Sequence, residues 1–230
     1  MNILVTGSNR GLGLALVQKG VERGHTMIAA VRSPHSKLRE LKELINQHPD
    51  QVRLLYLDVT SEKSLNEGKK EVQNWGIHLD SIVNSAGIFI SRESELENLN
   101  FDEAIVAFEV NSIGPMRVVK HFFPLLSGRN RSCINISSEQ GSISNASRGD
   151  YFYGMSKAAL NMFSEKLKKG YPDLNVLSIH PGSIQKPFSG YRVNSEITDV
   201  ADEILNWIEG TKPFDTHHTY YDYKGQSIMF

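Results

Sequence analysis

A tyrosine and a lysine one helical turn apart could act together as a proton donor. Tyr153 and Lys157 stand four residues apart, and Ser137 and Ser138 precede them. Residues four apart share one face of a helix, so the ammonium would lie beside the phenol and favour its ionised form. An unperturbed tyrosine titrates at about 10, and a nearby positive charge would bring it closer to neutral pH. Ordinary amphipathic helices also show this spacing, so the pair needs support from the rest of the chain.

A glycine-rich segment near the start of the chain could hold a dinucleotide. Its glycines form a G-x-x-x-G-x-G pattern after the apolar run 2–6 and before a helical pattern. Glycines let the backbone turn tightly and approach a pyrophosphate, which the helix N-terminus attracts. A plain turn is the alternative, but the position after the first strand favours a dinucleotide site. The residues expected to contribute are Gly7, Ser8, Asn9, Arg10, Gly11, Leu12 and Gly13.

The end of the second predicted strand indicates which dinucleotide is preferred. A carboxylate at this place would hydrogen-bond the ribose hydroxyls and repel a 2′-phosphate. Here Val31 is followed by Arg32, whose guanidinium can pair with a phosphate, and Arg10 would flank that phosphate from the other side. We therefore expect NADP(H) to be preferred over NAD(H). The alternative is that both arginines are solvated surface charges.

Two further strand ends carry residues that would suit the coenzyme. Asp58 and Val59 close the third strand, and the Asp58 carboxylate could accept a hydrogen bond from the adenine amino group. Small residues close the fourth strand where a backbone would pass the ribose; they are Asn84, Ser85, Ala86 and Gly87. Both segments are equally compatible with ordinary turns.

The apolar pattern predicts the elements that would position these groups. We expect strands at 2–6, 26–31, 52–57, 81–84, 132–136, 175–179 and about 219–223. Helical periods lie between them, at about 12–17, 37–46, 61–74, 101–126, from 153 onward, and at 200–208. Parallel strands need crossover connections, so the alternation predicts an α/β fold, a doubly wound parallel sheet of about seven strands with helices on both faces. No linker rich in Pro, Gly or Ser divides the chain, so we expect one Rossmann-type domain over 1–230.

Composition excludes several classes of protein. Lys and Arg number 25 and Asp and Glu 26, which gives a formal charge of −1, and no segment is strongly basic. Nucleic acid and membranes are therefore not expected as partners. The eight histidines show no metal-ligand spacing, so no catalytic metal is expected. Cys133 is the one cysteine and no apolar run approaches the ~18 residues of a membrane span, so we expect a cytoplasmic protein.

With these segments in this order, the chain resembles the short-chain dehydrogenase/reductase (SDR) family over essentially its whole length. The family's TGxxxGxG loop corresponds to 6–13, and its NNAG segment to 84–87 with Ser85 in place of an asparagine. The family's remaining coenzyme contacts correspond to Asp58, Pro181, Gly182 and Ile184. Lys186 stands where the family has a threonine that contacts the nicotinamide carboxamide. The resemblance therefore leaves the usual anchoring of the nicotinamide ring in question.

The family's active-site tetrad corresponds to Asn111, Ser138, Tyr153 and Lys157. The resemblance implies hydride transfer from the nicotinamide to a carbonyl while Tyr153 gives a proton to the developing alkoxide. It implies that Ser138 hydrogen-bonds the same oxygen, and that Lys157 binds the nicotinamide ribose and lowers the tyrosine pKa. Asn111 would interrupt the long fourth helix and hold a water that links Lys157 to solvent. Within the family, the segments 141–143, 153–160 and 223–225 look most like the small carbonyl reductases grouped with C-factor and sniffer proteins.

The resemblance also bears on substrates and partners. The family closes its site with a segment after the PG turn, and here only about 183–198 is available, with Phe188 and Tyr191 as apolar residues. So short a loop predicts an open site that accepts several small carbonyl or alcohol compounds, unless these aromatics simply pack the loop onto the sheet. The family usually pairs its fourth and fifth helices, which implies a homodimer. The alternative function is an NADP-binding redox sensor or signalling protein on the same scaffold.

Overall fold

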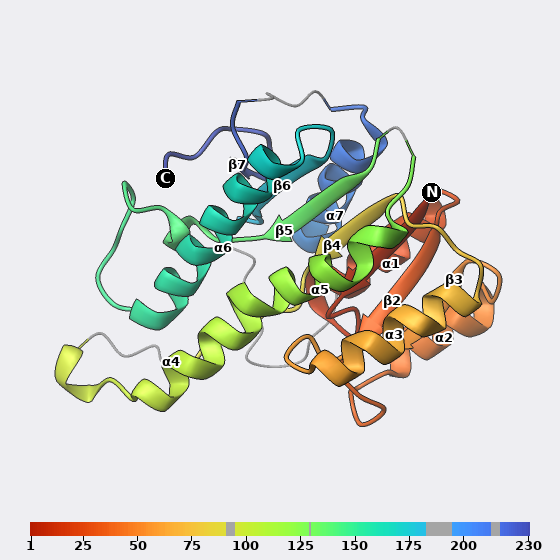
Figure 1. Ribbon diagram of the computed structural model, residues 1–230, viewed down its shortest axis with the longest axis horizontal. Helices are drawn as coiled ribbons and strands as arrows, with labels where there is room; N and C mark the ends of the chain where they lie inside the picture. Colours follow the sequence, from red (N-terminus) through yellow and green to blue (C-terminus); the bar gives the residue numbers. More distant parts are fainter. Residues whose placement is uncertain (91–94, 129, 183–194, 213–216) are drawn as a thin grey trace.

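The computed structural model describes residues 1–90, 95–128, 130–182, 195–212 and 217–230. One sheet of seven parallel strands, in the order β3-β2-β1-β4-β5-β6-β7, runs through the molecule (Figure 1). The strands are β1 (Asn2–Thr6), β2 (Thr26–Val31), β3 (Val52–Tyr56), β4 (Ser81–Asn84), β5 (Ser132–Ile136), β6 (Asn175–His180) and β7 (Tyr220–Asp222). The predicted doubly wound parallel sheet of a single Rossmann-type domain is confirmed.

Helices cover both faces of this sheet, because the crossover between two parallel strands must pass over one face or the other. One face carries α1 (Gly11–Glu22), α2 (Arg39–Gln47) and α7 (Ser195–Glu209), and the other carries α3 (Glu62–Asn74), α5 (Gly114–Phe122) and α6 (Tyr151–Gly170). In Figure 1 the second group lies in front of the strands. The helix α4 (Phe101–Phe108) extends from this front layer towards one end of the molecule.

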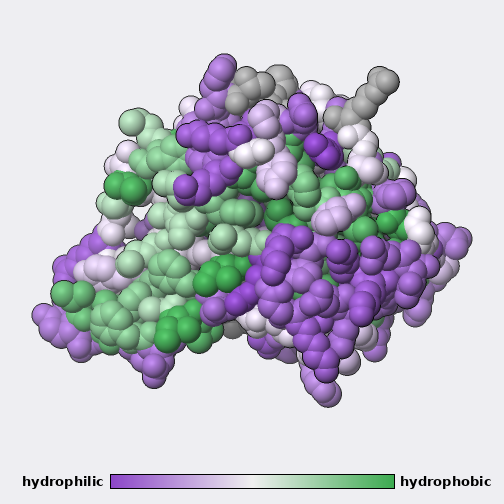
Figure 2. Space-filling view, in the orientation of Figure 1, coloured by the Kyte–Doolittle hydropathy of each residue, from purple (hydrophilic) through white to green (hydrophobic). Residues whose placement is uncertain are grey.

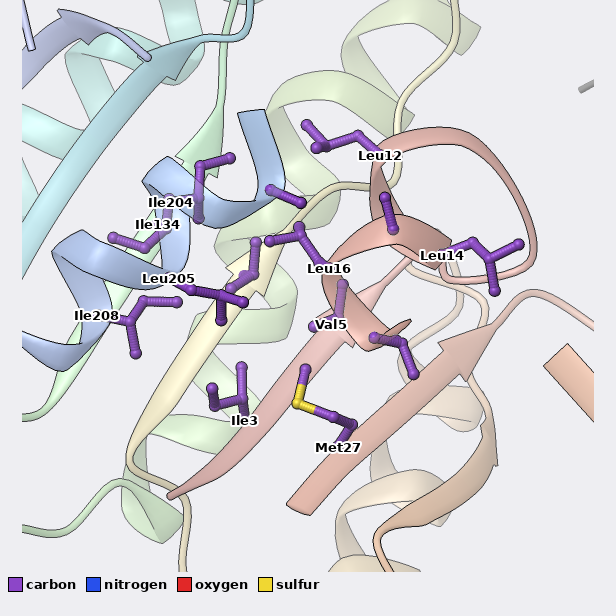
Figure 3. Close-up of a cluster of buried hydrophobic side chains, with 14 of the residues drawn as sticks. Ile3, Val5, Leu12, Leu14, Leu16, Met27, Ile134, Ile204, Leu205 and Ile208 are labelled. Atoms are coloured by element: carbon purple, nitrogen blue, oxygen red, sulfur yellow. The ribbon is translucent and has the colours of Figure 1, made fainter. Parts of the chain in front are cut away.

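The central strand β1 contributes to two separate cores. Ile3 and Val5 point towards α1 and α7, whereas Leu4 points to the opposite face, as the two-residue period of a strand requires (Figure 3). Gly20 lets α1 lie close to the sheet, since a Cβ there would stand 2.2 Å from the sulfur of Met27. Burial on both faces explains why the strands read as continuous apolar runs.

The helical stretch predicted at about 101–126 is interrupted as expected. A π-helical segment, Glu109–Ile113, separates α4 from α5, and a 3₁₀ turn, Phe123–Leu125, follows α5. Pro115 has no N–H with which to bond the carbonyl of Asn111 in an α-helix, which favours a change of helical geometry here. Other boundaries differ from the prediction by up to about five residues: α1 ends at 22 and not at about 17, and α7 begins at 195 and not at 200.

Candidate active site

The serine and the tyrosine come from neighbouring elements that glycines bring close together. Ser138 follows β5 and precedes a 3₁₀ turn, Glu139–Gly141, while Tyr153 lies in the first turn of α6. A Cβ on Gly141 would meet the backbone of Lys157 at 2.9 Å, and one on Gly154 would meet the carbonyl oxygen of Gln140 at 2.9 Å. The loop that carries Ser138 therefore packs on α6 as closely as two backbones can.

Tyr153 packs against an aromatic ring and lies beside the Ser138 side chain. The ring of Phe89 packs edge-on against its ring, with 4.4 Å between the centroids. Burial raises the pKa of the Tyr153 phenol, and hydrogen bonding with the Ser138 side chain acts in the opposite direction. The phenol therefore lies beside a hydroxyl, and the two groups could hydrogen-bond one ligand oxygen.

Lys157 lies one turn further along α6 and is buried. Its Nζ donates a hydrogen bond of 2.7 Å to the carbonyl oxygen of Ile136 and stands 5.7 Å from the centre of the Tyr153 ring. Burial lowers the pKa of the Lys157 ammonium to about 8. The expectation that Lys157 brings the tyrosine pKa below its ordinary value is not met in this structure. Desolvation is the largest influence on both groups, and it opposes the charged form of each.

Asn111 lies in the π-helical segment with its side chain fully engaged. Its Oδ1 accepts from the amide of Ile88 at 2.9 Å, and its Nδ2 donates to the carbonyl oxygen of Ile88 and to Ser156 Oγ, each at 3.0 Å. The side chain thus joins the segment after β4 to α6, next to Lys157. That Asn111 also holds a water molecule remains a prediction.

The glycine loop has the close backbone contacts of a dinucleotide cradle. Gly7 adopts a φ of +70°, and a Cβ there would meet Ala86 Cα at 2.9 Å. A Cβ on Gly13 would stand only 2.4 Å from the carbonyl oxygen of Gly7. Thr6 Oγ1 accepts the amides of Ser85 and Ala86, which fixes the second loop against the first. Arg10 precedes α1 in an extended conformation and no side chain caps this N-terminus, which suits an anionic ligand.

Three of the expected coenzyme residues also make polar contacts within the scaffold. Ser8 is fully buried; its amide donates to Ala30 and its hydroxyl to Val5. Asn84 donates from Nδ2 to Asn135 Oδ1 at 2.8 Å inside the sheet. These contacts turn Ser8 and Asn84 inward. Asp58 Oδ1 accepts from the amide and the hydroxyl of Thr60, which is the turn chemistry that the sequence left open.

The remaining expected residues lie around the same edge of the sheet. Arg32 is exposed directly after β2, and Val59 packs beside Gly114. Gly87 is near both Asn111 Oδ1 and Lys157 Nζ, at 3.4 and 3.8 Å from a Cβ built on it. Pro181 and Gly182 follow β6. Ile184, Lys186, Phe188 and Tyr191 lie outside the described residues.

The structure adds residues that the sequence reading missed. Asn161 on α6 accepts from Ser137 Oγ at 2.6 Å and donates to the carbonyl oxygen of Gly141, so it holds both ends of the serine loop. His180, the last residue of β6, accepts the amide of Glu139 on Nδ1 at 3.1 Å. Spacing gives no signal for such contacts. Phe89 could have been noticed in the sequence as an aromatic residue two positions after Gly87.

The described parts of the chain lack two kinds of feature. No group of three or more metal-ligating side chains occurs among them. None of the helices in the described ranges combines the length and apolarity needed to span a membrane.

Comparisons with known proteins identify the family. The sequence profile of the short chain dehydrogenase family matches residues 1–196. An oxidoreductase of Schizosaccharomyces pombe is 33% identical over 211 residues, which cover 89% of this chain and 81% of that protein. Short-chain dehydrogenase RED3 of Pyricularia oryzae is 31% identical over 191 residues, which cover 80% of this chain and 76% of RED3.

Solved structures share the fold along the whole chain. The carbonyl reductase Sniffer of D. melanogaster superposes with a TM-score of 0.86 at 24% identity, covering 100% of this chain and 99% of Sniffer. The NADPH-bound carbonyl reductase from chicken fatty liver gives a TM-score of 0.85 at 24% identity, covering 100% and 98%. The likeness to these structures establishes the fold. The family match over most of the sequence, together with relatives above 30% identity, shows that this chain belongs to the short-chain dehydrogenase/reductase family of oxidoreductases.

Proposed function

We propose that the protein is an NADP(H)-dependent carbonyl reductase that transfers a hydride between the nicotinamide and a carbonyl or alcohol substrate. The observation that carries this proposal is the convergence of Ser138, Tyr153 and Lys157, which the contacts at Gly141 and Gly154 permit. Membership of an oxidoreductase family supports it. Two fold relatives are carbonyl reductases, which favours the C-factor/sniffer-type subgroup.

Each side chain has its own task in this proposal. Bound coenzyme supplies the hydride. Tyr153, which burial keeps protonated, donates its proton to the substrate oxygen as negative charge builds there. Ser138 hydrogen-bonds the same oxygen and stabilises that charge. Lys157 contacts the nicotinamide ribose, and its positive charge beside the phenol stabilises the phenolate that remains.

The residues that would hold the coenzyme are those of the glycine loop and the segment after β4. The Gly7–Ala86 and Gly13–Gly7 contacts leave no room for side chains, so backbone amides face the edge where α1 begins. A preference for NADP(H) rests on Arg32, exposed where NAD-specific folds carry a carboxylate. Two fold relatives were solved with NADPH or NADP bound, which is consistent with this preference.

The tyrosine assignment is tested by Tyr153→Phe, which deletes only the hydroxyl. We expect coenzyme to bind nearly as before and carbonyl reduction to slow by a factor on the order of 10² or more. Tyr151→Phe removes a hydroxyl from the same helical turn and should retain turnover. NADPH oxidation with a panel of aldehydes, ketones and quinones supplies the assay. Near-normal turnover of Tyr153→Phe would contradict the mechanism.

The same panel separates the reductase from the alternative function, an NADP-binding redox sensor or signalling protein. A reductase turns over at least one carbonyl compound, whereas a sensor binds coenzyme without turnover. The panel also tests the open site expected from the loop predicted at about 183–198, whose last four residues belong to α7 in the structure. Similar kcat/KM values across several small carbonyls support an open site, and a thousandfold preference for one compound refutes it.

A second copy of the chain is the partner that we propose for the front face of the molecule. Figure 2 shows an apolar area over α4 that continues towards α5 and α6. Its large exposed side chains are Phe101, Ile105, Val106, Met116, Met155 and Met162. Contiguous apolar surface of this kind marks an interaction site. The interrupted helix α4–α5 and the helix α6 correspond to the fourth and fifth helices that the SDR family pairs, so we assign the face to a homodimer.

A further inference from the structure

The carbonyl of Ser138 is held from two directions. Within the serine loop it accepts the amide of Gly141 at 2.9 Å. From the far edge of the sheet it accepts the hydroxyl of Tyr220, on β7, at 2.5 Å. A carbonyl oxygen has two lone pairs, and these two donors use both. The backbone that carries the Ser138 side chain is thus fixed by a residue 82 positions later in the chain.

Tyr220 is itself held firmly. Its side chain is fully buried, and the ring of Phe230 stacks on it with 5.6 Å between centroids and 28° between planes. The carbonyl oxygen of Phe230 accepts from both the amide and the hydroxyl of Ser144. Ser142 Oγ donates to the carbonyl oxygen of Met229 at 2.6 Å. The segment after β7 therefore binds the far end of the serine loop while Tyr220 binds its start.

The Tyr220 hydroxyl stays protonated and can therefore always donate its hydrogen bond. Burial raises the pKa of its phenol to about 12, so the hydroxyl keeps its proton at any pH at which the protein is handled. A second tyrosine close to the reacting group thus supplies a fixed hydrogen bond and exchanges no proton.

We propose that Tyr220 is a positioning residue, which sets the place of the Ser138 hydroxyl relative to Tyr153 through the Ser138 carbonyl. This inference rests on the proposed function, because Ser138 must contact the substrate oxygen for its position to matter. Loss of the Tyr220 hydroxyl would let the backbone at Ser138 rotate. Displacing a reacting group by a fraction of an ångström to 1 Å slows catalysis without preventing coenzyme binding.

A double-mutant cycle tests the inference with Tyr220→Phe, Ser138→Ala and the combined variant. We expect Tyr220→Phe alone to lower kcat roughly tenfold with the KM for NADPH unchanged. In the Ser138→Ala background the same change should have almost no further effect, since the group it positions is gone. A change that only weakened the fold would lower kcat to the same extent in both backgrounds.

Tyr221→Phe is the matched control. Tyr221 is the next residue of β7, so its side chain points to the opposite face of the sheet, where its ring packs on Trp207. Its kcat should equal that of the unmodified protein. Amide exchange gives a readout that does not depend on turnover, and exchange at Gly141 and Ser142 should accelerate in Tyr220→Phe only.

The outcomes separate the two hypotheses. If Ser138→Ala retains full turnover, the serine role in the proposed function fails and the positioning role fails with it. If Ser138→Ala loses turnover while Tyr220→Phe matches the unmodified protein in kcat and in amide exchange, the positioning inference alone is overturned. Additive effects of the two substitutions on kcat would likewise overturn it.

Discussion

At the scale of single residues, burial sets the protonation states on which the proposed chemistry depends. It raises the pKa of Tyr153 and lowers that of Lys157 to about 8. Below pH 8 the phenol therefore holds its proton and the ammonium holds its charge. This is the pair of states that proton donation to a carbonyl requires.

A pH dependence follows from the lysine. Its pKa is lowered, so the charged form is lost as pH rises through about 8. We expect kcat/KM for NADPH, which reports the groups of the free enzyme, to be level below this value and to fall about tenfold per pH unit above it. Initial rates from pH 6 to 9.5 provide the measurement. A level profile to pH 9.5 would show that Lys157 stays charged or is not required.

Arg32 provides a second prediction at this scale. If its guanidinium pairs with the 2′-phosphate, Arg32→Asp replaces attraction by repulsion and should weaken NADPH binding by roughly tenfold or more. NADH lacks that phosphate, so its Kd should change much less. Arg39→Asp is the control, because Arg39 is exposed on α2 and pairs with Glu43. Equal affinity of the unmodified protein for the two coenzymes, by fluorescence titration, would refute the preference.

At the scale of elements, close backbone approach builds both halves of the site. Gly13 makes the tightest of the backbone contacts in the glycine loop, since a Cβ there would stand 2.4 Å from the Gly7 carbonyl oxygen. Gly13→Ala must therefore push the first turn of α1 away from the loop. We expect the free energy of unfolding to fall by about 1–3 kcal/mol and coenzyme affinity to fall with it.

Denaturant titration with and without NADPH measures both effects of Gly13→Ala. Gly170→Ala is the comparison, because a Cβ at that position, the last of α6, meets no atom within 4 Å. It should unfold at the same denaturant concentration as the unmodified protein or slightly higher. Unchanged stability and affinity of Gly13→Ala would mean that the loop can shift without cost.

The elements themselves could be predicted because their signals are local. Each buried parallel strand is a short apolar run, and each covering helix shows its own period. The spacing of Tyr153 and Lys157 could be read locally, whereas the roles of Asn111 and Ser138 came from resemblance to a family. No local rule places Asn111 beside Ser156. Contacts such as Tyr220 to Ser138 could not be predicted, because a hydrogen bond between residues 82 positions apart leaves no pattern in the sequence. Likewise, the spacing of Tyr153 and Lys157 did not reveal that burial raises the pKa of the tyrosine and lowers that of the lysine.

At the scale of the whole molecule, the apolar front face predicts association. Ile105 on α4 is 66% exposed, so Ile105→Asp should not disturb the core and should convert a dimer into monomers. Tyr56→Asp places the same charge on an exposed aromatic at the β3 edge of the sheet and should leave the dimer intact. Sedimentation velocity at micromolar protein distinguishes the species. A monomeric unmodified protein would refute the assignment of this face.

The packing of α1 on α7 has a consequence for biosynthesis. The Arg23 guanidinium, directly after α1, donates a hydrogen bond to Glu209, 186 residues later in the chain, and Leu16 of α1 belongs to the same core cluster as Leu205 of α7 (Figure 3). At about 5–20 residues per second, a ribosome needs roughly 10–40 s to make the intervening chain. During that interval the apolar side of α1 has no α7 to cover it. A nascent chain of this protein therefore carries exposed hydrophobic surface until α7 has been made, and we expect chaperones that act at the ribosome to bind it during that interval.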